Sequence, residues 1–151
     1  MAEQSLFEKI ADGTIPSWKV WEDDTYMAFL TPFPNTPGLT VVVPRKNVSD
    51  YIFDMEDDAI AGLMVASKKV AKLLEKALDI KRVALVFEGT GVAHVHAKLI
   101  PLNGDLGAQT NIWSRHQEFH PEYEGYITTA EGPKWTDEQL SEMQAKIKAA
   151  A

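Results

Sequence analysis

The longest regular pattern of apolar residues predicts an amphipathic helix over residues 55–78. Its apolar positions follow the spacing of one helical face: Ile60, Leu63, Met64, Val70, Leu73, Leu74 and Leu78. Asp54 would cap this helix, and the acidic residues of the first turn suit its positive end. A helix that is apolar along one face must pack against another surface, so we expect it to lie on a sheet.

Short runs of β-branched and aromatic residues on both sides of this helix predict strands over residues 18–22, 26–30, 39–43, 82–87 and 93–102. Asp23-Asp24 forms the turn between the first two, and the three prolines of residues 31–38 exclude regular structure there. This order of strands and helix predicts an α+β fold with an antiparallel sheet.

Two further helices are predicted near the ends of the chain. One is short and runs from Ser5 to Ile10; the other begins after Thr136, where Gln139 completes a capping-box pattern. We expect one domain over residues 1–151, with a core of about 5–102 and a loop-rich C-terminal extension, 103–151, that ends in the second of these helices.

Composition narrows the class of protein. The 151 residues are 45% hydrophobic, as in a folded domain, and the net charge of −7 disfavours nucleic-acid and membrane-surface partners. The chain has no cysteine, which excludes disulfides and thiolate zinc sites. No signal-peptide pattern or membrane-length apolar run is present. We therefore expect a cytoplasmic protein without a nucleic-acid or membrane partner.

The segment His94-Val95-His96-Ala97-Lys98 carries the most specific chemical pattern. Alternate residues of a strand point to the same face, so the two imidazoles and the ammonium would project together. Imidazole is nucleophilic and largely neutral near pH 7, whereas burying such groups without partners is costly. The pattern predicts a site for an anion that a histidine can attack.

With its flanking sequence, this segment resembles the histidine-triad (HIT) nucleotide hydrolases and transferases. The resemblance covers residues 5–102 and includes Gly13-x-Ile15-Pro16, Pro37-Gly38 and Val43-Pro44. It implies a HIT-like fold whose antiparallel sheet carries the long helix. It also implies that two copies of the chain form a homodimer.

The resemblance implies a role for each residue of the triad. His96 takes the position of the nucleophile that attacks the α-phosphorus of a nucleotide, and His94 that of the histidine that orients it. The third histidine is replaced by Lys98, whose ammonium can stabilise phosphoryl charge but would serve poorly as a proton shuttle. Leu39 stands where the family often carries another histidine.

The resemblance also implies the nucleotide-binding residues. Phe7, Ile10 and Phe29 correspond to the apolar wall for the base, although composition alone favours ordinary core positions for them. Thr31 replaces the aspartate that holds the ribose. Gly89, Thr90 and Gly91 correspond to the backbone beside the phosphate, or form a simple turn.

The predicted function is hydrolysis at the α-phosphate of a dinucleoside polyphosphate or a nucleoside phosphoramidate, with a purine nucleotide as the expected substrate. The alternatives are a nucleotide-binding protein with little turnover and a nucleotidyl transferase. No cofactor or metal is expected. His116 and His120 are spaced as a helical metal pair, but Pro121 disfavours a helix there.

Overall fold

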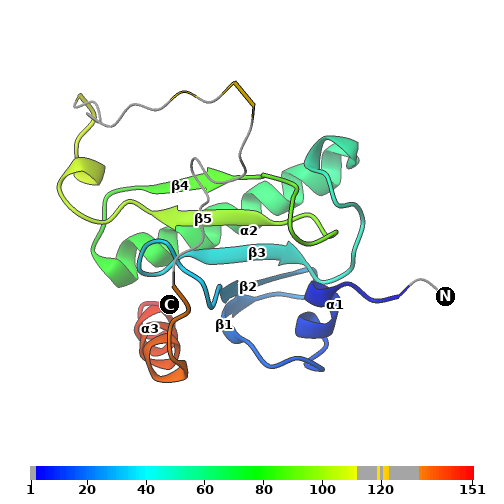
Figure 1. Ribbon diagram of the computed structural model, residues 1–151, viewed down its shortest axis with the longest axis horizontal. Helices are drawn as coiled ribbons and strands as arrows, with labels where there is room; N and C mark the ends of the chain where they lie inside the picture. Colours follow the sequence, from blue (N-terminus) through cyan, green and yellow to red (C-terminus); the bar gives the residue numbers. More distant parts are fainter. Residues whose placement is uncertain (1–2, 112–118, 120, 123–132) are drawn as a thin grey trace.

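The computed structural model describes residues 3–111, 119, 121–122 and 133–151. Within these residues one antiparallel sheet has the strand order β1-β2-β3-β5-β4 (Figure 1). Its strands are β1 (Trp18–Glu22), β2 (Tyr26–Leu30), β3 (Thr40–Pro44), β4 (Val83–Val86) and β5 (Ala97–Pro101). The predicted α+β class and antiparallel sheet are confirmed.

The described helices are α1 (Leu6–Ala11), α2 (Asp57–Leu78) and α3 (Asp137–Ala149), with short 3-10 turns at Ile52–Asp54 and Leu106–Ala108. The prediction that Asp54 caps the long helix is wrong, because that residue ends the first 3-10 turn and Glu56 occupies the N-cap position. Between them Met55 is extended, with φ −84° and ψ 153°, so the helix cannot begin earlier.

Alternation along the strands gives the sheet two differently covered faces. One face packs against α2 and α3 through a cluster that includes Ala28, Leu30, Val42, Ala97 and Leu99. The other face carries Met27, Phe29, Val41 and Val43, and Phe7 from α1 packs against them. α1 is thus separated from the two longer helices by the sheet (Figure 1).

The strand predicted over 93–102 is too long at its beginning, because β5 starts only at Ala97. The ladder between β3 and β5 joins Thr40 to Leu99, and Val42 to Ala97, and goes no further. Pro44 has no N–H to donate, and its carbonyl oxygen accepts a hydrogen bond from the ring of His94 instead of from a strand. The two histidines therefore precede the strand, although Val95 and Ala97 still face the core, as the alternation predicted.

The last helix is part of the main core. Its predicted capping box is present: the Gln139 N–H donates to Thr136 Oγ1, and the Thr136 N–H donates to Gln139 Oε1. Leu140 and Ile147 are buried in the same hydrophobic cluster as the apolar residues of α2 and of the sheet face that it covers. The boundary drawn at residue 102 stays a prediction. No described helix is both long enough and apolar enough to cross a membrane.

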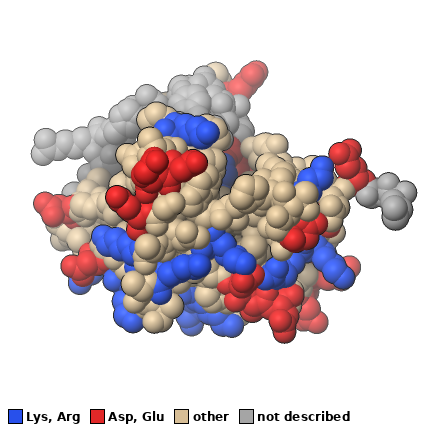
Figure 2. Space-filling view, turned by 90° about the horizontal axis from the view of Figure 1, so that it is seen from below, with Lys and Arg blue, Asp and Glu red and all other residues tan. Residues whose placement is uncertain are grey.

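Charged side chains of both signs are spread over the face that Figure 2 shows, and neither sign covers it alone. With a net charge of −7, the protein has an overall field that repels anions. An anionic ligand would therefore depend on positive or hydrogen-bonding groups within its own binding site.

Candidate active site

A pocket of about 720 Å³ lies on the α1 side of the sheet. Leu6, Phe7 and Ile10 of α1 form one side, and residues of β2, β3 and the segment 88–92 complete it. His96 and Lys98 also line the pocket. A mostly apolar hollow with a few polar groups is the usual form of a small-molecule site.

His96 has a defined tautomer. Its Nδ1 lies 2.8 Å from the backbone carbonyl oxygen of His94, and because that oxygen can only accept, Nδ1 carries the hydrogen. Burial is the main cause that lowers the pKa of His96, and the charge of Lys98 lowers it further. The ring is therefore neutral near pH 7, and Nε2 holds a lone pair without a hydrogen-bond partner among the described residues.

His94 is fully buried and both of its ring nitrogens are engaged. Nε2 donates to the Pro44 carbonyl oxygen at 2.8 Å, so the neutral ring accepts at Nδ1 from the Ser5 hydroxyl at 2.6 Å. Burial lowers the pKa of His94 and favours this neutral form. His94 does not line the pocket; its backbone carbonyl, rather than its ring, holds the ring of His96.

Ser5 connects α1 to this histidine segment and was missed as a site residue in the sequence. Its hydroxyl accepts the Glu8 N–H at 3.1 Å as the N-cap of α1, while it donates to His94. The Glu8 carboxylate accepts from the N–H groups of Ser5 and Asn47, and Asn47 Nδ2 donates to the Ala93 carbonyl. The Ser-x-x-Glu capping pattern was the available signal.

Lys98 forms an ion pair with Glu88 inside the pocket. Nζ lies 2.9 Å from the carboxylate, and the Lys98 and Glu88 side chains are 20% and 6% exposed. Sequence reasoning gave Glu88 no role, because only its position at the end of a strand pointed to it. The positive charge expected to hold a phosphate thus has an acidic partner at the site itself.

The other predicted residues divide into those that line the pocket and those that do not. Phe7, Ile10, Phe29, Thr31, Thr90 and Gly91 line it, whereas Gly89 does not. Gly89 and Gly91 have φ values of 75° and 88°, which favour glycine. The Thr31 hydroxyl accepts the Phe33 N–H at 3.2 Å. The wall also contains residues that sequence reasoning did not select: Leu6, Ile15, Pro16, Trp18 and Phe33.

The Phe7 ring connects the apolar wall with the histidines. Its centroid lies 5.2 Å from that of His96 and 5.6 Å from that of His94, with edge-on geometry in both cases. It also packs against Phe29 at 5.4 Å. Contact with the Phe7 ring therefore restricts the positions of both imidazole rings, while their hydrogen bonds fix the orientation of each ring.

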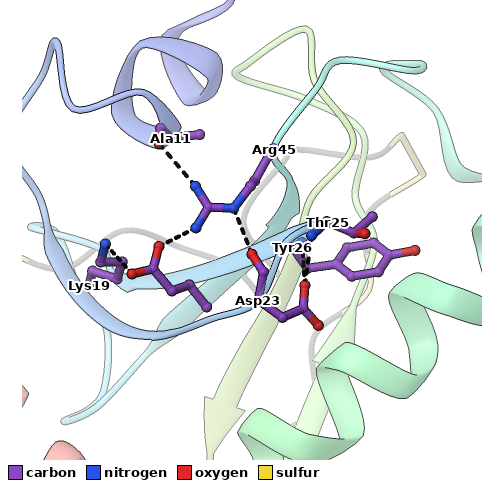
Figure 3. Close-up of polar contacts among 7 residues, drawn as sticks. Ala11, Lys19, Asp23, Thr25, Tyr26 and Arg45 are labelled. Carbon is purple, nitrogen blue, oxygen red and sulfur yellow. Dashed lines mark hydrogen bonds and ion pairs between the residues drawn. The ribbon is translucent and has the colours of Figure 1, made fainter.

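Arg45 anchors the opposite end of α1 (Figure 3). Its guanidinium donates to the carbonyl oxygens of Ala11 and Asp23, at 3.1 and 2.7 Å, and pairs with the Glu22 carboxylate. Arg45 directly follows Pro44, whose carbonyl oxygen accepts the hydrogen bond from His94 Nε2. The same corner of the sheet thus holds both the helix and the buried histidine.

The proposed metal pair, His116 and His120, lies outside the described residues. Within the part of the chain that the structure describes, no group of three or more histidine or acidic side chains is placed to hold a metal ion.

Comparison with known proteins gives concordant matches. The family model described as HIT domain matches residues 12–105. A HIT-like protein of Saccharolobus solfataricus is 31% identical over 101 residues, which cover 64% of this chain and 72% of the relative. The crystal structure of a HIT-like protein involved in cell-cycle regulation from Bartonella henselae has 28% identity and a TM-score of 0.69, covering 97% of this chain and 96% of the other.

A second solved structure supports the fold alone. It is a hypothetical histidine triad nucleotide-binding protein from Sulfolobus tokodaii, with 21% identity and a TM-score of 0.72, and the match covers 95% of this chain and 89% of that one. The matches thus extend from the sheet and its histidine segment to nearly the whole chain.

Proposed function

The chain belongs to the HIT domain family, whose members bind nucleotides and act as hydrolases or transferases, and we propose that it hydrolyses a nucleotide at the α-phosphorus through His96. The observation that carries this proposal is the tautomer of His96. A neutral, buried imidazole whose Nδ1–H is held by a backbone carbonyl presents the Nε2 lone pair that nucleophilic catalysis requires.

The proposed reaction has two displacements at phosphorus. In the first, the Nε2 lone pair forms a bond to the α-phosphorus while the bond to the leaving oxygen or nitrogen breaks with its electron pair, and the leaving group takes a proton from solvent. In the second, water attacks the nucleotidyl-histidine, the P–Nε2 bond returns its electrons to His96, and a proton is released. The product is a nucleoside monophosphate.

The surrounding residues support this reaction in distinct ways. Lys98 supplies positive charge to the phosphoryl oxygens, and His94 is a positioning residue that acts through its carbonyl. Phe7, Ile10 and Phe29 offer an apolar surface for a purine base. Thr90 and Gly91 also line this pocket, where their backbone can lie close to the phosphate. We propose a dinucleoside polyphosphate or a nucleoside phosphoramidate as the substrate.

We also propose that two copies of the chain form a homodimer. β4 is an edge strand of the described sheet, so no other described strand pairs with its outer side. Sedimentation equilibrium should give twice the mass of the chain, and a single-chain mass at micromolar concentration would contradict pairing.

A trapping experiment tests the nucleophile. Protein mixed briefly with substrates labelled at the α-phosphate, and quenched in alkali, should carry acid-labile label on the tryptic fragment 83–98, which contains both histidines. His96→Ala should remove the label and lower turnover by several orders of magnitude. His94→Asn is the matched control, because it alters the neighbouring ring but leaves Nε2 of His96 in place, so label should still form, more slowly.

The outcomes separate the alternatives. Near-normal turnover by His96→Ala would refute the nucleophile. Binding of adenosine monophosphate without turnover of any adenosine or guanosine dinucleotide or phosphoramidate would establish the binding-protein alternative. Transfer of the labelled nucleotide to added phosphate in preference to water would establish the transferase.

A further inference from the structure

The ion pair between Glu88 and Lys98 determines the charge of the described pocket lining before any ligand enters. Glu88 is the second residue after the end of β4, and Lys98 lies on β5, so the two neighbouring strands bring the groups together. The distance of 2.9 Å and the low exposure of both side chains make this a partly buried pair. Charges in such a place interact more strongly than charges in water.

These two side chains are the charged groups among the described residues that line the pocket. His96, the remaining ionisable lining residue, is neutral near pH 7 because burial lowers its pKa. The formal charges of the described lining therefore sum to zero. A phosphate that approaches Lys98 gains one attraction and meets one carboxylate.

We propose that Glu88 is a specificity-determining residue that makes the pocket select phosphorus groups with a single negative charge over phosphate monoesters with two. The inference rests on the proposed nucleotide function. A phosphate joined to two organic groups carries one charge, whereas a monoester loses a second proton near pH 6 and carries almost two at pH 8. Glu88 offsets the attraction of Lys98, so the described lining offers no net positive charge to stabilise the second ligand charge, and the overall charge of −7 disfavours it.

The selection favours the direction of the reaction. Hydrolysis replaces a P–O or P–N linkage with a P–OH group, and that group then ionises. The substrate linkage thus enters with one charge on phosphorus, and the product leaves with nearly two. At the α-phosphorus, Glu88 therefore repels the product phosphate more than the substrate linkage and so promotes release of the product.

Binding of two matched ligands tests the proposal. Adenosine 5′-monophosphate and its phosphate methyl ester differ by one charge at pH 8 and share the base and ribose. Isothermal titration at fixed ionic strength should show that the wild-type protein binds the methyl ester about tenfold more tightly, which is the size expected of one partly screened charge. This measurement needs no variant.

Three variants locate the effect. Glu88→Gln should tighten binding of the monophosphate about tenfold more than it tightens binding of the methyl ester, because the monophosphate carries one further negative charge. Glu88→Asp keeps the charge and should keep the wild-type preference. Glu75→Gln is the control for loss of one carboxylate elsewhere, because Glu75 pairs with Lys72 on α2 at 2.6 Å, in a more exposed place outside the pocket, and should change neither affinity.

Equal binding of both ligands by the wild-type protein, or equal gains for both in Glu88→Gln, would overturn the role of Glu88 and leave the nucleotide function standing. Failure of both ligands to bind the wild-type protein and every variant would overturn the nucleotide function, and this inference with it.

Discussion

Ser5→Ala tests whether the cap of α1 also holds the buried histidine. The hydroxyl makes two interactions, accepting the Glu8 N–H at 3.1 Å and donating to His94 Nδ1 at 2.6 Å. Loss of an N-cap costs about 1 kcal/mol of the free energy of unfolding. Leaving a buried ring nitrogen without its donor costs about 1–3 kcal/mol more. We expect a total loss of about 2–4 kcal/mol, with a decrease in Tm of about 5–12 °C for a chain of this size.

Thr136→Ala is the matched control. Thr136 caps α3 with the same reciprocal pattern, but its hydroxyl accepts the Gln139 N–H and contacts no histidine among the described residues. It should therefore lose only the capping contribution of about 1 kcal/mol. Ser5→Thr keeps a hydroxyl at the cap and should recover most of the stability that Ser5→Ala loses.

Urea unfolding followed by circular dichroism measures all three variants. The m-values should stay at the wild-type value, so that the midpoints report stability alone. Equal losses in Ser5→Ala and Thr136→Ala would refute the reasoning, because they would show that the hydroxyl stabilises only the helix and contributes nothing through His94.

Three other perturbations test the site. Lys98→Ala should lose about 2–4 kcal/mol of transition-state stabilisation in kcat/KM, and Lys98→Arg should recover part of it; a loss confined to substrates with poor leaving groups would instead identify a proton donor. Because burial lowers the pKa of His94 and His96 in the folded state, the unfolded chain binds more protons below about pH 6.5. The free energy of unfolding should therefore fall from pH 7 to pH 5, and it should fall less steeply in His96→Ala. Thermal melts at each pH measure this dependence, and a flat profile would contradict it. Preincubation with EDTA should leave turnover nearly unchanged, because the proposed nucleophile is a side chain and Lys98 supplies positive charge; abolition by EDTA and rescue by a divalent ion would contradict this.

The fold was most predictable where local patterns were complete. β1 and β2 match the predicted ranges to the residue, because the Asp23-Asp24 turn separates two short runs of apolar and aromatic residues. In that turn the Asp23 N–H donates to the Tyr26 carbonyl oxygen. β3 is shifted by one residue, since the backbone of Leu39 closes the proline loop through Thr31 and Thr36. Ends that depend on hydrogen bonds between distant segments cannot be located from the local sequence.

The site was predictable in its residue types but not in its connections. Alternation brought His96 and Lys98 to one pocket, as predicted, but the ring of His94, which was predicted to project with them, does not line it. The alternation could not show that the ring of His94, rather than a strand N–H, donates to the Pro44 carbonyl oxygen. Nor could it show that the hydroxyl of Ser5, 89 positions earlier, donates to the other ring nitrogen of His94. Glu88 was missed for the same reason, because its partner becomes adjacent only when β4 and β5 pair.

The attachment of α1 to His94 has a consequence for the size of base that the pocket can process. α1 has only six residues, yet it carries the Phe7 wall and the Ser5 cap on the same short segment. A base too large for the space beside Phe7 would displace α1 and pull the Ser5 hydroxyl away from Nδ1 of His94. We therefore expect an oversized nucleobase analogue to lower kcat while its KM changes little, so that the fit of the base is measured by the speed of the chemistry at His96.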